Sequence, residues 1–263
     1  MSPYLFISKI KIQSALAYRF DVLSSIVMQG IIMFAAAFFW IAVYGERASA
    51  MGVTRDGMLT YTVMSSFIGS LFINGVELRI IQSIRKGSIA VDMIKPVNLF
   101  GIFLAEDMGG VVVAFFQQSL PLLLIASLFI HFPIPASGIH FLLFLASFTL
   151  SYAINWLLSA IFGMWAFTAI SLEAMRATKL HLIRLLSGSI IPLWFFPSWL
   201  QYLLELLPLP YIYQLPLSIF IGKYDFRTIA VQMAIQLTWT AVLLAAFLFL
   251  QKRATSRVLV QGG

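Results

Sequence analysis

The sequence has no cysteine, and only 10% of its 263 residues are charged. Without cysteine the chain can form neither a disulfide nor a thiolate metal site. The three histidines (His131, His140 and His181) are scattered and have no carboxylate partners at a metal-ligand spacing, so we expect no metal site. We also find no paired nucleophile and base for an intramembrane hydrolase or acyltransferase, and we expect no catalytic residue in this chain.

The scarcity of charge indicates a membrane protein. Soluble domains contain roughly a quarter charged residues, whereas 61% of this chain is hydrophobic and its mean hydropathy is +0.95. A helix needs about 20 mostly apolar residues to cross a bilayer. Six segments are candidates, namely 22–44, 57–77, 103–130, 138–170, 180–198 and 228–250. We therefore expect an all-α integral membrane protein with six transmembrane helices and a single transmembrane domain over 1–263.

The fifth candidate, 180–198, is interrupted by Pro192 and Pro197, and the apolar stretch 199–222 after it contains three more prolines. Proline removes a backbone donor and breaks helices. We predict that 199–222 forms short helices that lie at the outer face of the membrane or are partly re-entrant. Its aromatic residues fit an interfacial belt, with burial in the protein core as the alternative. These aromatic residues are Trp199, Tyr202, Tyr211 and Tyr213, together with Trp194 just before the stretch.

Lysine and arginine are unevenly distributed over this topology. With the N-terminus inside, the outer segments hold only Arg47, Arg55, Lys223 and Arg227, out of the 17 basic residues. The inner segments hold Lys9, Lys11, Arg19, Arg79, Arg85, Lys86, Lys95, Arg176, Lys179, Arg184, Lys252, Arg253 and Arg257. By the positive-inside rule, we expect both termini in the cytosol of a bacterial plasma membrane. The net charge of +7 then follows from topology and anionic membrane lipids, and requires no nucleic acid.

The first segment, 1–21, mixes apolar residues such as Phe6 and Ile10 with Lys9 and Lys11. This mixture is typical of an amphipathic helix that lies on the inner leaflet. A frayed tail is the alternative.

The first cytosolic loop, 78–100, contains the stretch "RKGSIAVDMIKPVNLF". Its beginning has a helical apolar pattern, Gly87 is a helix-stop signal, and Pro96 ends a second short apolar element. We interpret it as a short helix that docks on a partner. A loop that only places its cations among lipid head groups is the alternative.

The pattern Arg-Lys-Gly-Ser-Ile-x-x-Asp-Met-Ile-Lys-Pro-Val, after the second of six spans, resembles the permease subunits of ABC-2-type exporters. The late stretch "SGSIIPLWFFPSWLQYLLELLPLPYIYQLP" is similar to the same family's region before the last span, and the resemblance covers nearly the whole chain. It implies that the loop contains a coupling helix that enters a groove on a cytosolic ATPase. The residues that would form or brace this contact are Arg85, Lys86, Gly87, Ile89, Asp92, Lys95 and Pro96.

The chain has no G-x-x-x-x-G-K-[ST] phosphate-binding motif, and its only Gly-Lys pair, Gly222-Lys223, is followed by Tyr224. We therefore expect ATP and Mg²⁺ to bind a partner ATPase and no cofactor to bind this chain. The resemblance implies two ATP-binding subunits and a second permease half, identical or related. The largely apolar interior indicates a hydrophobic or amphiphilic cargo. A membrane channel or scaffold without an ATPase is the alternative function.

Two adjacent carboxylates, Glu106 and Asp107, lie near the cytosolic start of the third segment. We expect them in the first turn of a helix, where they would favour the helix dipole. A role as an inner gate is the alternative. We interpret the charged residues after the fourth segment, Glu173, Arg176, Lys179 and Arg184, as a solvated turn with ion pairs along one helix face. The resemblance also allows a second ATPase contact here.

Overall fold

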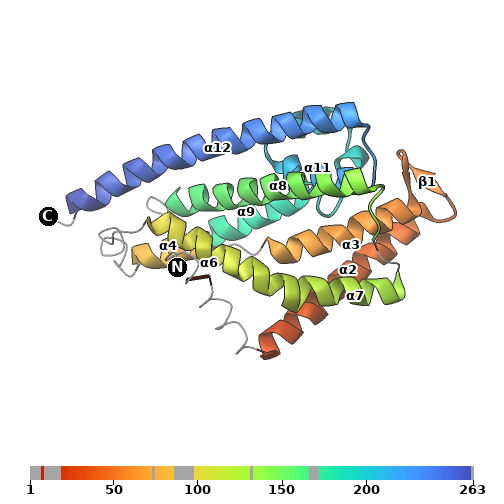
Figure 1. The fold of residues 1–263 in the computed structure, drawn as a ribbon, viewed down its shortest axis with the longest axis horizontal. Helices are drawn as coiled ribbons and strands as arrows, with labels where there is room; N and C mark the ends of the chain where they lie inside the picture. Colours follow the sequence, from red (N-terminus) through yellow and green to blue (C-terminus); the bar gives the residue numbers. More distant parts are fainter. Residues whose placement is uncertain are drawn as a thin grey trace.

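The computed structural model describes residues 7–8, 19–72, 75–85, 98–130, 133–165 and 172–261. These residues form helices and one short hairpin (Figure 1). The first half contains α2 (Arg19–Tyr44), β1 (Ser49–Ala50), β2 (Val53–Thr54), α3 (Arg55–Leu71), α4 (Val76–Arg85), α6 (Leu99–Ala114), η1 (Phe115–Ser119) and α7 (Leu120–Phe129). The second half contains α8 (Gly138–Trp165), α9 (Leu172–Leu186), η2 (Leu193–Phe195), α10 (Ser198–Glu205), η3 (Leu209–Tyr211), α11 (Gln214–Phe220) and α12 (Phe226–Gln261).

Five stretches of the described residues are long and apolar enough to cross a membrane. They are Val22–Tyr44, Arg55–Ser83, Leu99–Phe129, Gly138–Met164 and Phe226–Arg253. They correspond to five of the six predicted segments. The chain is therefore a helical multi-pass membrane protein, as predicted, with five spans by this measure.

The predicted fifth span, 180–198, is not a continuous helix. The chain nevertheless passes here from the α4 end, where Lys179 contacts Glu77, to the hairpin end, where Trp194 lies by Lys223. Helix α9 ends at Leu186, and Gly188 has a φ of +83° that a helix cannot contain. Pro192 then keeps the next residues out of a regular helix, so that only the short η2 forms before Pro197, after which α10 begins at Ser198.

The backbone groups released by this break find partners on other helices. The Tyr61 hydroxyl on α3 donates to the carbonyl of Gly188 at 2.7 Å, and Ser65 Oγ donates to the carbonyl of Ser189 at 2.6 Å. On α11, the Gln214 side chain accepts the backbone N–H of Leu193 at 3.1 Å. Irregular backbone is stable inside a membrane protein only when its polar groups are satisfied in this way.

The segment 199–222 contains the short helices α10, η3 and α11. Helix α11 is buried along its whole length, where it packs against α8 and α3. Tyr211 and Tyr213 are accordingly buried, so the core alternative holds for these two residues. Trp199 and Tyr202 on α10 are exposed, which agrees with an interfacial position.

Helix α8 is the centre of the bundle, because it contacts α12, α11 and α4. A buried amide fixes the contact between α8 and α12. The Gln236 amide on α12 donates to the Ser147 carbonyl and Ser151 Oγ on α8, both at 3.0 Å, and to the Tyr211 carbonyl at 2.9 Å. In return, Ser147 Oγ donates to the Gln236 amide oxygen at 3.0 Å. Hydrogen bonds between helices of this kind hold membrane bundles together.

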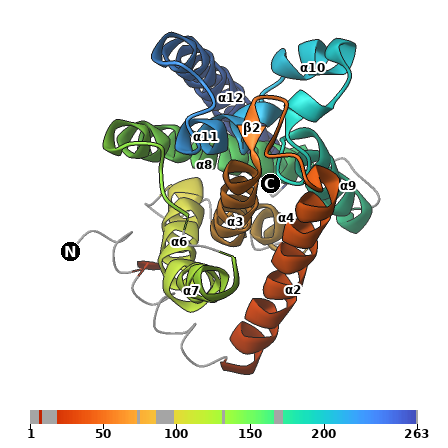
Figure 2. The same cartoon turned by 90° about the vertical axis from the view of Figure 1, so that its right-hand side faces the viewer.

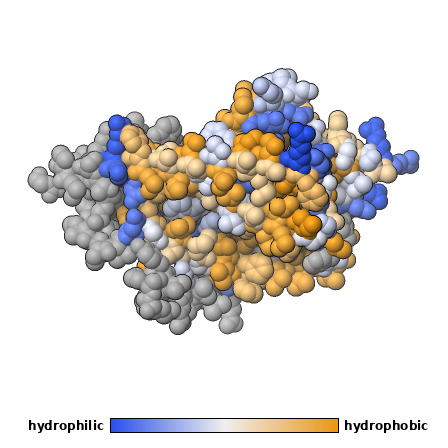
Figure 3. All heavy atoms as spheres, turned by 45° about the horizontal axis from the view of Figure 1, so that its top comes forward, coloured by the Kyte–Doolittle hydropathy of each residue, from blue (hydrophilic) through white to orange (hydrophobic). Residues whose placement is uncertain are grey.

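The outer surface has the distribution expected for a bundle in a bilayer. Figure 3 shows a broad hydrophobic area on one face, with hydrophilic residues mainly toward the two ends of the molecule. Helix α12 has 36 residues and so is about 54 Å long, more than the hydrocarbon core of about 30 Å. Its C-terminal end extends beyond the neighbouring helices in Figure 1.

Two predicted features fall largely on residues that the structure does not describe. Of the proposed inner-leaflet helix 1–21, only Ile7 and Ser8 and the start of α2 at Arg19 are described. The loop 78–100 is described as far as Arg85 and again from Asn98. The docking-helix prediction for residues 86–97 therefore stays a prediction.

Candidate functional site

Helix α4 precedes the predicted coupling segment, and a buried ion pair anchors it to α9. Glu77 on α4 is 5% exposed and Lys179 on α9 is 8% exposed, and their side chains form this pair. The Lys179 ammonium also donates to Ser159 Oγ on α8 at 3.1 Å. These two interactions connect three helices at a single point.

A second set of charges connects α4 to α6. Asp107 on α6 is 3% exposed and accepts three hydrogen bonds. The donors are the Arg79 guanidinium, the backbone N–H of Gly75 at 2.9 Å and the indole N–H of Trp156 on α8 at 2.9 Å. Because all three donors converge on a single carboxylate, Asp107 holds the start of α4 against both α6 and α8.

Arg79 makes further contacts with α6. Its Nε lies 3.1 Å from Glu106 Oε2, and its Nη2 donates to the Phe103 carbonyl at 3.1 Å. We call the five charged residues Glu77, Arg79, Glu106, Asp107 and Lys179 the α4 ion-pair network. Removing one partner of a buried pair is costly, typically about 3–5 kcal/mol. The network therefore makes α4 a firmly attached part of the bundle.

Close packing at a glycine brings α4 against α8. A Cβ at Gly163 would lie 2.9 Å from Ile80 Cδ1 and 3.2 Å from Glu77 Cα, both on α4. A side chain at this position would thus push the α4 backbone away from α8. The small residue allows the close approach on which the Lys179–Glu77–Ser159 contacts depend.

The structure changes the interpretation of Glu106 and Asp107. Helix α6 begins at Leu99, where Asn98 Oδ1 accepts the backbone N–H groups of Phe100 and Gly101. Glu106 and Asp107 are therefore about two turns inside the helix, and the prediction that they lie in its first turn is wrong. They serve as ion-pair partners of Arg79. Their proposed role as an inner gate stays a prediction.

The predicted ATPase-contact residues lie just beyond this network. Arg85 is the last residue of α4, whose backbone is described. The other six are outside the described residues, namely Lys86, Gly87, Ile89, Asp92, Lys95 and Pro96. The network therefore holds the two flanks of the predicted coupling segment, α4 before it and α6 after it.

Reasoning from the sequence missed Glu77 and misread Lys179. Lys179 is buried against α4, so its interpretation as part of a solvated turn is wrong. A signal was present, because Glu77 ends an otherwise apolar predicted span and Lys179 immediately precedes another. Opposite charges at the same membrane depth are expected to pair.

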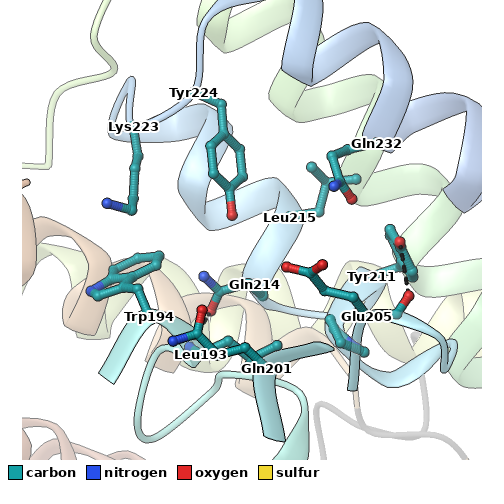
Figure 4. A pocket seen from close by; sticks show the side chains of 11 residues that line it. Leu193, Trp194, Gln201, Glu205, Tyr211, Gln214, Leu215, Lys223, Tyr224 and Gln232 are labelled. Carbon is teal, nitrogen blue, oxygen red and sulfur yellow. Dashed lines mark hydrogen bonds between the residues drawn. The ribbon is translucent and has the colours of Figure 1, made fainter. Parts of the chain in front are cut away.

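At the opposite end of the molecule from α4, a cavity of about 250 Å³ lies between α10, α11 and the start of α12 (Figure 4). We call it the outer pocket. Its lining is Leu193, Trp194, Gln201, Glu205, Pro210, Tyr211, Gln214, Leu215, Lys223, Tyr224 and Gln232. In Figure 4 the Glu205 carboxylate and the Tyr224 hydroxyl point into the pocket. The Lys223 ammonium lies 4.7 Å from the centroid of the Trp194 ring.

Burial shifts the pKa values of three titratable groups in the outer pocket. Burial raises the pKa of Tyr211 to about 12, and the charge of Glu205 adds to this effect. Burial also raises the pKa of Tyr224, although its hydrogen bonds to Ser218 and Gln214 reduce this increase. The pKa of Lys223 is lowered by its partial burial.

A larger and purely apolar groove of about 640 Å³ lies within the spanning region, between α3, η1 and α8. Its lining includes Phe67 on α3, Phe115 and Phe116 on the π-helix η1, and Phe144 and Phe148 on α8. A π-helical turn within a helix often marks a functional position. The groove offers no hydrogen-bonding side chain, so it suits the hydrocarbon part of a molecule.

These features define a class of protein, a multi-pass helical membrane protein with an anchored polar helix at one membrane face and a hydrophobic groove between its spans. The described residues contain no group of three or more histidine, aspartate or glutamate side chains that could hold a metal ion. Comparison with protein families assigns the chain more narrowly, because the family described as ABC-2 family transporter protein matches residues 30–262.

The chain belongs to this family, as its resemblance to ABC-2-type permeases indicated, and it is a membrane transport component. No curated protein and no solved structure matches it.

Proposed function

We propose that the chain is one permease half of an ATP-driven ABC-2-type exporter in a bacterial plasma membrane. It would work with cytosolic ATP-binding subunits, which bind ATP and Mg²⁺, and with a second permease half that is identical or related. Its cargo would be hydrophobic or amphiphilic. The observation that carries this proposal is the α4 ion-pair network, which ties both flanks of the coupling segment to the membrane helices.

The network would transmit a force on the coupling segment to the helices of the membrane domain. Residues 86–97 lie between α4 and α6, and the Arg79–Asp107 pair joins these two helices directly. The Glu77–Lys179 pair joins α4 to α9, and the hydrogen bond from Lys179 to Ser159 joins α9 to α8. A partner that pushes on 86–97 would therefore move four helices together and not merely bend a loop.

The distribution of charge supports a cytosolic position for this end. Arg79, Lys179 and the basic residues Lys252 and Arg253 of α12 lie at the end of the bundle that contains α4, whereas the β1–β2 hairpin lies at the opposite end (Figure 1). The hairpin end holds Arg47, Arg55, Lys223 and Arg227, whereas the α4 end also has Arg85 and Arg176, and the sequence places Lys86 and Lys95 between α4 and α6. This asymmetry agrees with the positive-inside rule.

The apolar groove supports a hydrophobic or amphiphilic cargo. It is open to the surface within the spanning region, and its wall is formed by phenylalanine, leucine, valine, methionine and proline side chains. A strongly hydrated cargo would gain no polar contacts there and would lose its water. A hydrocarbon chain would not incur this cost.

The coupling proposal is tested with charge reversal of Arg85 and Lys86, and with Ile89→Asp, after reconstitution with the partner ATPase in lipid. We expect membrane insertion to persist while ATPase association weakens about thirtyfold, because a mismatched charge at a desolvated contact costs roughly 2 kcal/mol or more. Lys252→Glu is the matched control, since it changes a cation at the same end of the bundle but outside the segment.

Wild-type ATPase association in all three loop variants would contradict the coupling role. If no ATP-binding subunit co-purifies with the gently solubilised chain, even when neighbouring genes are co-expressed, the channel or scaffold function would be favoured.

A further inference from the structure

The outer pocket contains opposite charges that are not paired with each other. Glu205 and Lys223 both line it. Within the described chain, the ion pairs are formed by other residues, and the Lys223 ammonium instead donates to the Met51 carbonyl at 2.8 Å. An ammonium has three donors, so Lys223 keeps donors for a ligand. A small pocket with one separated charge of each sign is matched to a ligand that also has both.

We propose that the outer pocket binds the zwitterionic head group of a phospholipid, with Glu205 next to its ammonium and Lys223 next to its phosphate. This inference goes beyond the proposed exporter function and does not depend on it. The site would hold a lipid from the membrane face on which α10 and the β1–β2 hairpin lie.

The positions of the aromatic rings indicate where the ammonium end of the ligand would lie. The face of Trp194 is already covered by the Lys223 ammonium, at 4.7 Å from the ring centroid. The remaining rings, Tyr211 and Tyr224, lie on the side of Glu205, where the Tyr211 hydroxyl donates to the Glu205 carbonyl at 3.3 Å. Figure 4 shows the Glu205 carboxylate directed into the space beside them. A carboxylate together with aromatic rings is a favourable site for an alkylammonium group.

The position of the pocket matches the depth of lipid head groups. Helix α10, which carries Glu205, exposes Trp199, Tyr202 and Leu203 to 70%, 71% and 53%, while Leu204 on its inner side is 1% exposed. A short helix with one buried face and an exposed face of tryptophan, tyrosine and leucine is typical of the membrane interface. Figure 2, which looks onto this end of the molecule, shows α10 at its rim. The pocket on the inner side of α10 is therefore within reach of a head group.

The balance of charge excludes simpler ligands. An anionic lipid without an ammonium would find Lys223 but would be repelled by Glu205. A plain cation would be attracted by Glu205 but repelled by Lys223. The head group of phosphatidylethanolamine has both charges, and so offers an ammonium to Glu205 and a phosphate to Lys223.

The test measures lipid binding to the purified permease chain by native mass spectrometry, with phosphatidylethanolamine and phosphatidylglycerol offered in equal amounts. For the wild-type chain we expect a preference for phosphatidylethanolamine of up to about fivefold, the ratio that one ammonium–carboxylate contact near a surface supplies. Glu205→Gln should abolish this preference, and Lys223→Gln should weaken the binding of both lipids. Asp225→Asn, at an exposed carboxylate near the pocket that does not line it, should leave the preference unchanged.

Equal binding of both lipids to the wild-type chain would overturn the proposal, and so would an unchanged preference in Glu205→Gln. Lys223 also holds the hairpin through Met51, but Glu205 lies on an exposed helix, so Glu205→Gln tests the site without disturbing the fold. Soluble phosphoethanolamine should not displace the lipid at equal concentration. Displacement would show that the site takes a free zwitterion, which would overturn the lipid assignment. Because no ATPase is present, these results are independent of the exporter proposal.

Discussion

Lys179 on α9 and Glu77 on α4 form a buried ion pair, although they are 102 residues apart in the chain. Both lie near the end of the bundle where the predicted coupling segment leaves the membrane domain. Each residue has its backbone on a different helix, so the pair can form only when α4, α8 and α9 have come together. The pair therefore shows that this end of the bundle has assembled.

The Glu77–Lys179 pair should be strongly coupled. Glu77→Leu alone and Lys179→Met alone should each lower the free energy of unfolding by about 3–5 kcal/mol, because each leaves a buried charge without a partner. The double variant should recover most of this loss, since no buried charge remains. Thermal unfolding in detergent of the two single variants and the double variant measures the coupling. Additive losses would show that the two side chains do not interact.

Asp107 should matter far more than its neighbour Glu106. Their side chains are 3% and 29% exposed, and Asp107 accepts three hydrogen bonds from Gly75, Arg79 and Trp156. Asp107→Asn should cost about 2–4 kcal/mol in the free energy of unfolding. Glu106→Gln, at a partly solvated pair, should cost less than about 1 kcal/mol. Equal losses measured by thermal unfolding would contradict the central position of Asp107.

Gly163 and Gly110 should respond in opposite ways to alanine. At Gly163 a Cβ would meet Ile80 and the Glu77 backbone at 2.9 and 3.2 Å, whereas at Gly110 it would meet nothing within 4 Å. Gly163→Ala should therefore cost about 1–3 kcal/mol through overpacking between α4 and α8. Gly110→Ala should be neutral or stabilise by up to about 1 kcal/mol through helix propensity. A tolerated Gly163→Ala, seen as an unchanged unfolding temperature, would mean that α4 packs less closely than described.

The predicted topology can be tested with single cysteines, because the chain has no cysteine of its own. Ser2→Cys, Ser88→Cys and Ser256→Cys should be protected from an impermeant thiol reagent in intact cells. Ala48→Cys, at an exposed position just before β1, should be labelled. All four should react after the cells are lysed. Labelling of Ser88→Cys in intact cells would contradict both the topology and the coupling role of the loop.

The apolar periodicity and length of the segments were enough to predict five of the spans. Segments such as 22–44 and 228–250 have no other stable position than a bilayer, because burying that much apolar surface needs a hydrocarbon solvent. Proline positions were likewise enough to predict short helices after residue 198. They were not enough to show that the break begins as early as Ser187, because that depends on Gly188 and on its distant partners Tyr61 and Gln214.

The family resemblance could be identified from contiguous residues, since the loop pattern and the proline-rich late stretch are each local in the chain. The candidate site could not. Asp107 looked like a partner of a helix dipole and Lys179 like a solvated charge, because local sequence does not show which distant helix will cover them. Likewise, nothing in the order of residues places Glu205 and Lys223 on the same pocket.

The sequence by itself therefore determined the membrane class, most of the spans, the uneven distribution of basic residues and the absence of a nucleotide-binding motif. These properties follow from composition and from the spacing of residues along a single segment, so they do not depend on how the helices pack. Only the tertiary structure decided that Glu77 pairs with Lys179, that Arg79 pairs with Asp107, and that α11 is buried. The physical reason is that charge pairing and burial depend on distances between helices, which are set by packing at positions such as Gly163 and not by neighbours in the chain.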